Sequence, residues 1–197
     1  MKLKQSLPFI FFISITLLFF SSCAIFKQGK EFITFTECDF NVKNVRITSL
    51  AGVDISNFNS IDDLALNDYL MLVQQAFSKE IDSELEIDII ADNFSDNTAS
   101  ISGLDWQLFL KDELYTTGII DKPVNINPHD NTVFTVKTNI NLYTIIHSKS
   151  LPEILTLLIT KNQSFNLSDL NATVKVKPWY RNGSTIKKYP GFISINL

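Results

Sequence analysis

The sequence predicts a mainly β protein, an antiparallel β-sandwich with one long helix and one or two short helices. Three stretches carry the prediction, because polar and apolar residues alternate along 83–89, 104–110 and 132–140. Neighbouring side chains of a strand point to opposite faces, so this alternation directs one set of side chains into a core. The inward set is Leu85, Ile87, Ile89, Trp106, Leu108, Leu110, Phe134, Val136 and Ile140.

The outward residues of the first stretch raise the possibility of an enzyme. Glu84, Glu86 and Asp88 project from one face, with successive carboxylates about 7 Å apart. This spacing falls within the range used by inverting glycosidases, so a hydrolase that uses Glu86 and Asp88 is one hypothesis. Such an enzyme also needs a cleft and a carboxyl group with a raised pKa, and the sequence predicts neither. A solvated outer face is the preferred interpretation.

Further strands are predicted before the central block of the chain, residues 84–141. Residues 32–38 and 42–47 have the pattern of two early strands, and residues 52–56 that of a short third strand. The first of these stretches includes Cys38, which is predicted to be a buried strand residue and not a nucleophile. If the other cysteine, Cys23, is acylated, Cys38 has no partner for a disulfide within the chain.

The long helix is predicted to follow Ser60. The Ser60 side chain can cap its N-terminus, Asp62 and Asp63 lie where the helix dipole favours anions, and Lys79 lies in the last turn. Apolar residues at helical spacing predict a buried face that covers one open end or side of the sandwich. This face comprises Leu66, Leu70, Val73 and Phe77, widened by Tyr69 and Leu72.

Two short helices and a last group of strands complete the predicted order. The helical stretches are 142–147 and 152–160, followed by a polar bridge at 164–168 and renewed alternation at 172–177. Asn182-Gly183 tolerates the positive φ of a type I′ turn and therefore predicts a hairpin. The last predicted strand is 192–197. Because no linker or internal repeat divides the chain, residues 32–197 are predicted to form a single domain.

The first residues of the chain indicate export. Lys2 and Lys4 give a basic start, and an apolar run of about 14 residues then ends in the small residues 21–22. A membrane-spanning helix needs about 20 apolar residues, so residues 1–22 are predicted to be a signal peptide. Phe20-Ser21-Ser22-Cys23 resembles the lipobox of bacterial, Bacteroidota-like lipoproteins. The resemblance implies that Cys23 is acylated, as with palmitate; a simple cleaved signal and an uncleaved anchor are the alternatives.

Acylation of Cys23 would hold the protein at a membrane. Each buried CH₂ contributes about 0.8 kcal/mol, and two or more acyl chains make the attachment essentially permanent. Residues 23–31 would then be the lipidated cysteine and its tether, which spans at most about 25 Å over residues 24–30. No acidic run follows Cys23. By analogy with lipoprotein sorting, this favours the cell outer membrane, facing the periplasm, over the inner membrane or the cell surface.

Composition and motifs limit the partners. The formal net charge is −4, and it becomes more negative when Lys2 and Lys4 leave with the signal peptide. Nucleic acid is therefore not an expected partner, because phosphate binding needs a concentrated basic surface. The glycines form no phosphate-binding fingerprint, and His129 and His147 have no metal-ligand spacing. The sequence predicts no cofactor, no metal site and no catalytic residue.

One surface feature has two interpretations. Trp179 and Tyr180, together with Arg181, Lys187 and Lys188, surround the last predicted hairpin. Strand packing with a soluble tip is the preferred interpretation. The alternative is a contact site for anionic glycans or lipid head groups near a membrane.

The central block is similar to the type-2 late embryogenesis abundant proteins, the family of the water-stress and hypersensitive-response domain. The resemblance is carried by Asp92-Asn93 and the segments 102–110, 114–120, 123–128 and 132–141. It implies an immunoglobulin- or fibronectin-like sandwich with one or two helices, an association with stress protection, and no catalytic residues.

These observations predict a membrane-tethered, non-enzymatic lipoprotein of the bacterial envelope that acts as a binding, structural or stress-protection module. Its expected partners are the membrane, through Cys23, and an envelope protein or lipid. The alternative function is a carrier or assembly factor for an apolar ligand such as a lipid, which would need an apolar cavity of roughly several hundred Å³. The carboxylate-dependent hydrolase is the third hypothesis.

Overall fold

The computed structural model describes residues 26–146, 153, 155 and 172–197, and over these residues the protein is mainly β. The strands are β1 (Asp39–Leu50), β2 (Val53–Asp54), β3 (Asp82–Asn93), β4 (Ala99–Ile101), β5 (Gly103–Leu110), β6 (Glu113–Ile120), β7 (Val124–Ile126), β8 (Asp130–Asn141), β9 (Thr173–Asn182), β10 (Thr185–Lys188) and β11 (Ile193–Asn196). The helices are residues 26–36, the 3₁₀ turn η1 (Ile61–Asp63), α2 (Leu66–Ser78) and α3 (Leu142–Ile146).

Some predictions fall outside the described residues. They concern the signal peptide over 1–22, the lipidated Cys23 and the polar bridge at 164–168. Of the helix predicted over 152–160, only Glu153 and Leu155 are described, and both are helical.

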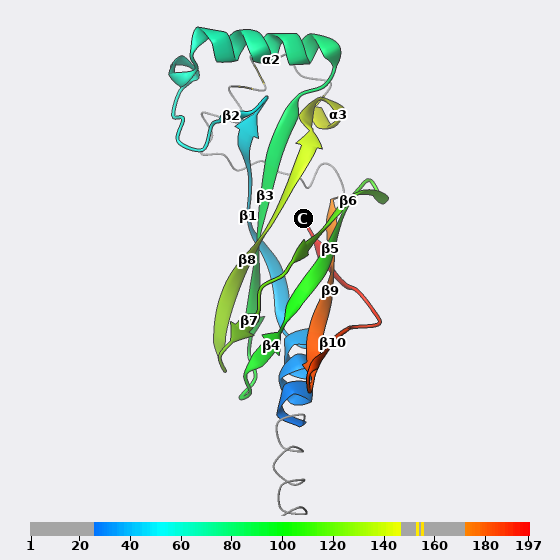
Figure 1. The fold of residues 1–197 in the computed structure, drawn as a ribbon. Coiled ribbons are helices and arrows are strands. Elements are labelled where there is room, and N and C mark those ends of the chain that lie inside the picture. The colour runs from blue at the N-terminus through cyan, green and yellow to red at the C-terminus, as the bar shows by residue number, and fades with distance from the viewer. Residues whose placement is uncertain (1–25, 147–152, 154, 156–171) are drawn as a thin grey trace, which may run out of the picture.

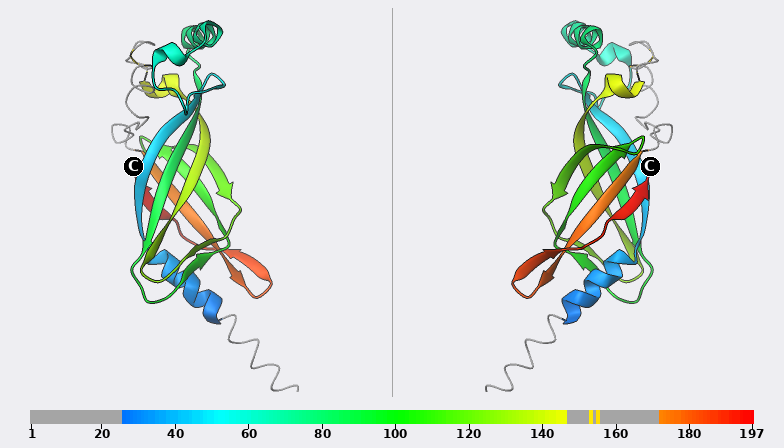
Figure 2. Two further views of the ribbon diagram at one scale, coloured as in Figure 1. Left: turned by 90° about the vertical axis from the view of Figure 1, so that its left-hand side faces the viewer. Right: turned by 90° about the vertical axis from the view of Figure 1, so that its right-hand side faces the viewer.

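Two larger antiparallel sheets and a small one form the fold. The first sheet has the order β2-β1-β3-β8; the second has the order β10-β9-β5-β6, with β11 also paired to β9; β4 pairs with β7. The long strands β1, β3 and β8 continue toward α2 beyond the second sheet (Figure 1). Figure 2 shows how the strands of the two sheets curl around each other. Buried residues from both sheets form one continuous cluster, so the sheets share a core.

The alternation of the central block is confirmed in detail. β3 and β8 pair without interruption from Asp82 opposite Asn141 to Asn93 opposite Asp130. The predicted inward residues of β3 and β8 are buried. On β5, Trp106 and Leu108 are buried as well, whereas Leu110 is half-buried because it lies at the end of the strand.

The prediction of a strand over residues 32–38 is wrong. The chain is helical through residue 36, and it continues as a turn to the start of β1. Phe32 and Phe35 recur at helical spacing and are buried, and the Phe32 ring packs on Tyr180 with 4.5 Å between centroids. These contacts with the second sheet favour a helix over the aromatic, β-branched composition of the stretch. Residues 26–31 of the predicted tether belong to the same helix.

Cys38 is buried as predicted but lies in the turn before β1 rather than in a strand. Its thiol donates to the Thr34 carbonyl at 3.4 Å. Burial, with added repulsion from the Asp92 and Glu37 charges, raises the pKa of the Cys38 thiol to about 11. A thiol that stays protonated at neutral pH is a poor nucleophile.

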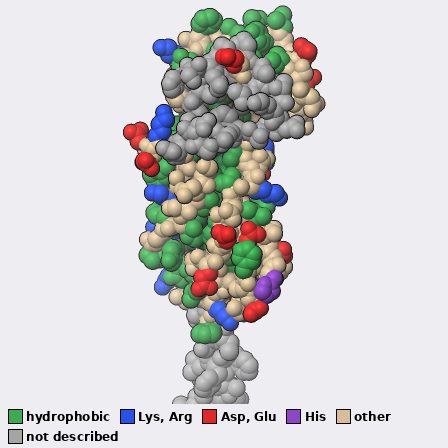
Figure 3. Space-filling model, turned by 180° about the vertical axis from the view of Figure 1, so that it is seen from behind, with side chains coloured by type: hydrophobic (Ala, Val, Ile, Leu, Met, Phe, Trp, Pro, Cys, Tyr) green, Lys and Arg blue, Asp and Glu red, His purple; other side chains and the backbone are tan. Residues whose placement is uncertain are grey.

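The long helix differs from its prediction in two ways. Ser60 caps η1 instead, in a capping box with Asp63, and α2 begins only at Leu66. The predicted buried face is wrong for Leu66, Leu70 and Phe77, which are 73%, 56% and 86% exposed, and right for Leu72 and Tyr69, which widened it. Since α2 lies across the end of the long strands (Figure 1), only the line through Tyr69, Leu72 and Ala76 meets the core. Hydrophobic side chains are exposed at this end of the molecule (Figure 3).

The C-terminal hairpin is confirmed, one residue later than predicted. Asn182 pairs with Thr185, so the turn consists of Gly183 and Ser184, and Gly183 supplies the positive φ of 64°. Beyond this hairpin β11 pairs with β9, which confirms the last predicted strand. The short helix α3 confirms the one predicted from residue 142.

Candidate functional site

An open groove lies between the outer edges of the two larger sheets. β8 is the last strand of the first sheet, and β6 is the last strand of the second. The two strands meet where the Asn141 backbone N–H donates to the Tyr115 hydroxyl at 2.8 Å and the Thr138 and Thr116 hydroxyls lie 3.5 Å apart. Farther along β8 they leave a groove of about 980 Å³.

The groove has an apolar floor and a polar rim. Its apolar lining includes Trp106, Ile120, Val124 and Phe134, and its charged lining consists of Asp121, Lys122 and Lys137. Exposed apolar side chains stand on both walls, with Ile119 60% exposed on β6 and Val133 39% exposed on β8. Such a surface can contact both apolar and polar parts of a ligand.

Gly118 gives the groove its floor. A Cβ atom on Gly118 would lie 2.3 Å from Cζ2 of Trp106, so only glycine lets the indole lie across β6 at this point. Both residues line the groove. The alternation along β5 assigned Trp106 to the core and gave no indication of a groove. The available signal was a glycine inside an otherwise regular strand, which marks a close approach.

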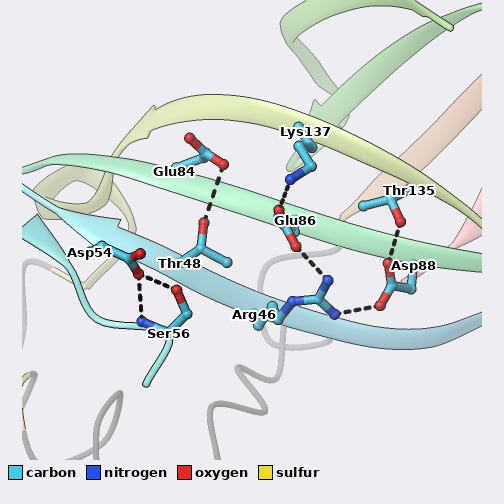
Figure 4. A network of polar contacts seen from close by, with 9 residues as sticks. All are labelled: Arg46, Thr48, Asp54, Ser56, Glu84, Glu86, Asp88, Thr135 and Lys137. Atoms are coloured by element: carbon cyan, nitrogen blue, oxygen red, sulfur yellow. Dashed lines mark hydrogen bonds and ion pairs between the residues drawn. The ribbon is translucent and has the colours of Figure 1, made fainter. Parts of the chain in front are cut away.

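The carboxylates of β3 form a network with the neighbouring strands (Figure 4). Arg46 on β1 donates to both Glu86 and Asp88, and Lys137 on β8 donates to Glu86. The Thr135 hydroxyl donates to Asp88 at 2.6 Å. Glu86 is only 5% exposed. The prediction of a solvated outer face is therefore wrong for Glu86, because cross-strand cations cover it.

The network holds both carboxylates ionised. Burial alone would raise the pKa of Glu86, but hydrogen bonds from Lys137 and Arg46 outweigh it and lower that pKa. Burial likewise opposes ionisation of Asp88, and hydrogen bonds from Thr135 and Arg46 lower its pKa. A general acid needs a pKa shifted in the opposite direction. Neither carboxylate lines the groove.

The five residues of the predicted surface contact have different environments. Trp179 is half-buried beside Gly103, and Tyr180 packs on Phe32 of the first helix. The Lys188 ammonium binds Asp105 at 2.7 and 3.0 Å and lies 4.9 Å from the Trp179 ring centroid.

The other two residues of this group, Arg181 and Lys187, are exposed. They have no ion-pair partner among the described residues. Both belong to the hairpin of β9 and β10, which lies near the first described helix, at the end of the molecule opposite α2 (Figures 1 and 2).

Metal-binding clusters and membrane-spanning helices are absent from the described ranges. No group of three His, Cys, Asp or Glu side chains is placed there to hold a metal ion. His129 pairs with Asp96, with 2.9 Å between Nε2 and Oδ1, at an exposed site. None of the helices in the same ranges has the length and apolar character needed to cross a membrane.

Comparisons with known proteins give only distant structural likenesses. No family model and no curated protein matches the sequence. A protein from Archaeoglobus fulgidus is similar in structure with a TM-score of 0.32 and 13% identity, over 59% of this chain and 84% of that one. A Bordetella pertussis structure described as an ApaA protein has a TM-score of 0.35 and 11% identity, over 81% and 93% of the two chains. Likeness at this level carries no conclusion about function.

Proposed function

We propose that this protein is a membrane-tethered, non-enzymatic binding module of the bacterial envelope. Its fold would be an immunoglobulin- or fibronectin-like sandwich, similar to the type-2 late embryogenesis abundant proteins, whose association with stress protection suggests a physiological setting. The groove between β6 and β8 carries the proposal. Its volume of about 980 Å³ is at the upper end of the range of roughly 300–1,000 Å³ that ligand sites occupy.

The ionic network argues against the hydrolase hypothesis. Glu86 and Asp88 are held by Arg46, Lys137 and Thr135, and their pKa values are lowered. Neither carboxylate lines the groove, and the groove is where a substrate would be bound. The network is best explained as a cross-strand clamp of the first sheet.

The groove also fits a polar chain better than an enclosed lipid. A lipid carrier shields acyl chains from water in an apolar cavity, whereas this groove is open and has Asp121, Lys122 and Lys137 on its walls. The lipid-carrier hypothesis therefore stays second.

The position of the first described helix suggests how the module would face its membrane. This helix lies at the end of the molecule that carries the β9–β10 hairpin (Figure 1), and Cys23 precedes its first residue by only three positions. An acylated Cys23 would bring Arg181 and Lys187 toward lipid head groups and hold α2 away from them. The groove would remain open on the side of the molecule, in the periplasm if the anchor is in the outer membrane.

The anchor and the groove have separate tests. Labelling with radioactive palmitate should mark the native chain and not Cys23→Ala; label that persists in the variant removes the anchor. For the groove, a photoreactive amino acid placed at Val133 should crosslink to a ligand in the native envelope. The same group at the exposed Ile186 of β10 is the control. Equal adducts at both positions, or none at Val133, would contradict the proposal.

A further inference from the structure

The groove contains a sheet edge that is open to another strand. β8 pairs with β3 along one side, and no described strand pairs with it along the other. The pairing with β3 is continuous over twelve residue pairs without a bulge. An edge of this kind presents a row of unpaired backbone N–H and C=O groups.

The alternation of hydrogen-bonded and non-bonded residue pairs between β8 and β3 identifies which backbone groups of β8 are free. The Leu142 N–H donates to the Ile81 carbonyl at 2.9 Å, which marks residues 142 and 81 as a hydrogen-bonded pair of the antiparallel ladder. Hydrogen-bonded and non-bonded pairs alternate. The even-numbered residues of β8 therefore bond to β3, and the odd-numbered residues direct their N–H and C=O groups to the open side. The Asn141 N–H confirms this alternation, because it donates across the open side to Tyr115.

Three odd-numbered residues of β8 face the groove in this way: Val133, Thr135 and Lys137. At one end of this run the Asn131 N–H is occupied by Asp130 Oδ1 at 2.8 Å. At the other end the Asn139 carbonyl accepts from the Thr138 hydroxyl at 3.4 Å. The donors and acceptors of Val133, Thr135 and Lys137 thus lie on the part of β8 that forms a groove wall.

The usual protections of an edge strand are missing at this site. Proteins shield their edges with short strands, bulges, proline or lysine side chains. Among the other edge strands of the two larger sheets, β2 has two residues, β10 and β11 have four each, and the pairing of the eight-residue β6 with β5 is broken by a register shift. β8 has twelve residues, no proline and no bulge. Its one lysine, Lys137, is drawn back onto Glu86 of β3.

We propose that β8 binds an extended polypeptide segment of a partner protein as an additional strand within the groove. This inference rests on the proposed function, and it specifies the class of ligand. Strand addition takes its affinity from the main chain and its specificity from pockets for alternate side chains. Apolar side chains at alternate positions would meet Trp106 and Phe134, and polar ones between them would face water. Lys137 is already paired with Glu86, so Lys122 is the wall cation that a carboxylate at one of the polar positions would meet.

A second copy of this chain does not fit the site in the same way. The free edge of β8 lies within the groove, facing β6 and residues 121–123. A single strand needs about 4.8 Å beside its neighbour. The edge of a second folded domain would bring its own sheet against β6.

The test is amide hydrogen exchange measured by NMR on the whole mature chain. The probe is a seven-residue, end-capped peptide in which valines alternate with threonine and glutamate. Bound peptide should slow exchange at Val133, Thr135 and Lys137 at least roughly tenfold, because their N–H groups gain partners, and leave the already bonded Phe134 and Val136 nearly unchanged. Two further peptides carry N-methyl groups on alternate amides. The peptide whose methylated amides would donate to β8 should not bind, and the peptide methylated at the other amides should still bind.

Two variants at one position separate backbone from side-chain effects. Val133→Pro removes an N–H that the ladder with β3 does not use, so it should fold and weaken the peptide roughly tenfold. Val133→Ala keeps the N–H and should bind within about threefold of the native chain.

The contrary outcomes are distinct. Peptide bound without slowed exchange at the odd-numbered residues overturns strand addition, and groove resonances that still shift with the peptide would leave the proposed function standing. If exchange at these residues is already slow without peptide, and becomes slower as the protein concentration is raised, the edge is assigned to a second copy. A short-chain phospholipid that displaces the peptide assigns the groove to lipid. Groove resonances that respond to neither probe overturn the proposed function as well.

Discussion

Arg46 determines what the two carboxylates of β3 do. Seen in the sequence alone, Glu86 and Asp88 favour a solvated face, with a catalytic pair as the alternative. Arg46 comes from a strand forty residues earlier and contacts both, and no pattern along the sequence predicts that cross-strand contact. The same holds for Lys137, because no pattern along β8 predicts its partner Glu86 on β3.

The first prediction concerns this clamp. Arg46→Met should lower the free energy of unfolding by about 1–3 kcal/mol, because it leaves Glu86 buried with one cation fewer. Urea unfolding at neutral pH measures the change. Arg181→Met is the control, and it should stay within about 0.5 kcal/mol of the native chain because Arg181 is exposed. Equal stability of the two variants would contradict the role of the network.

The second prediction is a dependence of stability on acid. The folded chain lowers the pKa of Glu86 below its ordinary 4.5 and that of Asp88 below 3.8. Their contribution is therefore complete above about pH 4.5 and is lost as pH falls toward the lowered values, because the unfolded chain takes up protons first. The free energy of unfolding should fall below about pH 4.5, and more steeply in the native chain than in Arg46→Met. Parallel curves would contradict the assignment.

At the scale of elements, the strands were predictable and the helices less so. Alternation has a period of two and identifies β3, β5 and β8 because each has one face in the core. The helix over residues 26–36 was missed because its composition favours a strand, and its contacts with Tyr180 are remote in sequence. α2 was predicted with the wrong face, since its apolar residues form two stripes and only the end of the sheet decides between them. The groove depends on how two sheet edges diverge, which no local pattern encodes.

The third prediction tests the corrected face of α2. Leu72 is fully buried, so Leu72→Ala should cost about 2–5 kcal/mol in the free energy of unfolding. Phe77 is 86% exposed, so Phe77→Ala should cost less than about 0.5 kcal/mol. Chemical denaturation of both variants makes the comparison. A larger cost for Phe77→Ala would restore the face that the sequence predicted.

The fourth prediction concerns the contact between β5 and β6. Gly118→Ala places a methyl group 2.3 Å from the present position of the Trp106 ring. It should destabilise the protein by about 1–3 kcal/mol through overpacking and displace the indole into the groove. Gly29→Ala is the control, because nothing lies within 4 Å of a Cβ at that position. Peptide binding undiminished in Gly118→Ala would show that Trp106 does not form the floor of the site.

Three features organise the whole molecule: a shared core, an end that carries the first described helix and the β9–β10 hairpin, and a groove on the side. The core gives the groove rigid walls, since β8 is fixed by twelve residue pairs to β3. The proposed acyl anchor would set the orientation of this frame and leave the groove accessible. Fold class and the proposed anchor follow from the sequence, whereas the binding surface required the structure.

The most direct test of the groove as binding site is the fluorescence of a tryptophan introduced at Ile119, which is 60% exposed on the β6 wall. The chain has two tryptophans of its own. Trp179→Phe removes one of them, and the other, Trp106, is only 4% exposed and is already shielded from water. In the chain with both Ile119→Trp and Trp179→Phe, titration with the alternating peptide should shift the emission saturably to shorter wavelength, because the added strand excludes water from the groove walls. Peptide that binds, as measured by fluorescence anisotropy, while the emission stays unchanged would place the site elsewhere and contradict the groove as the binding site.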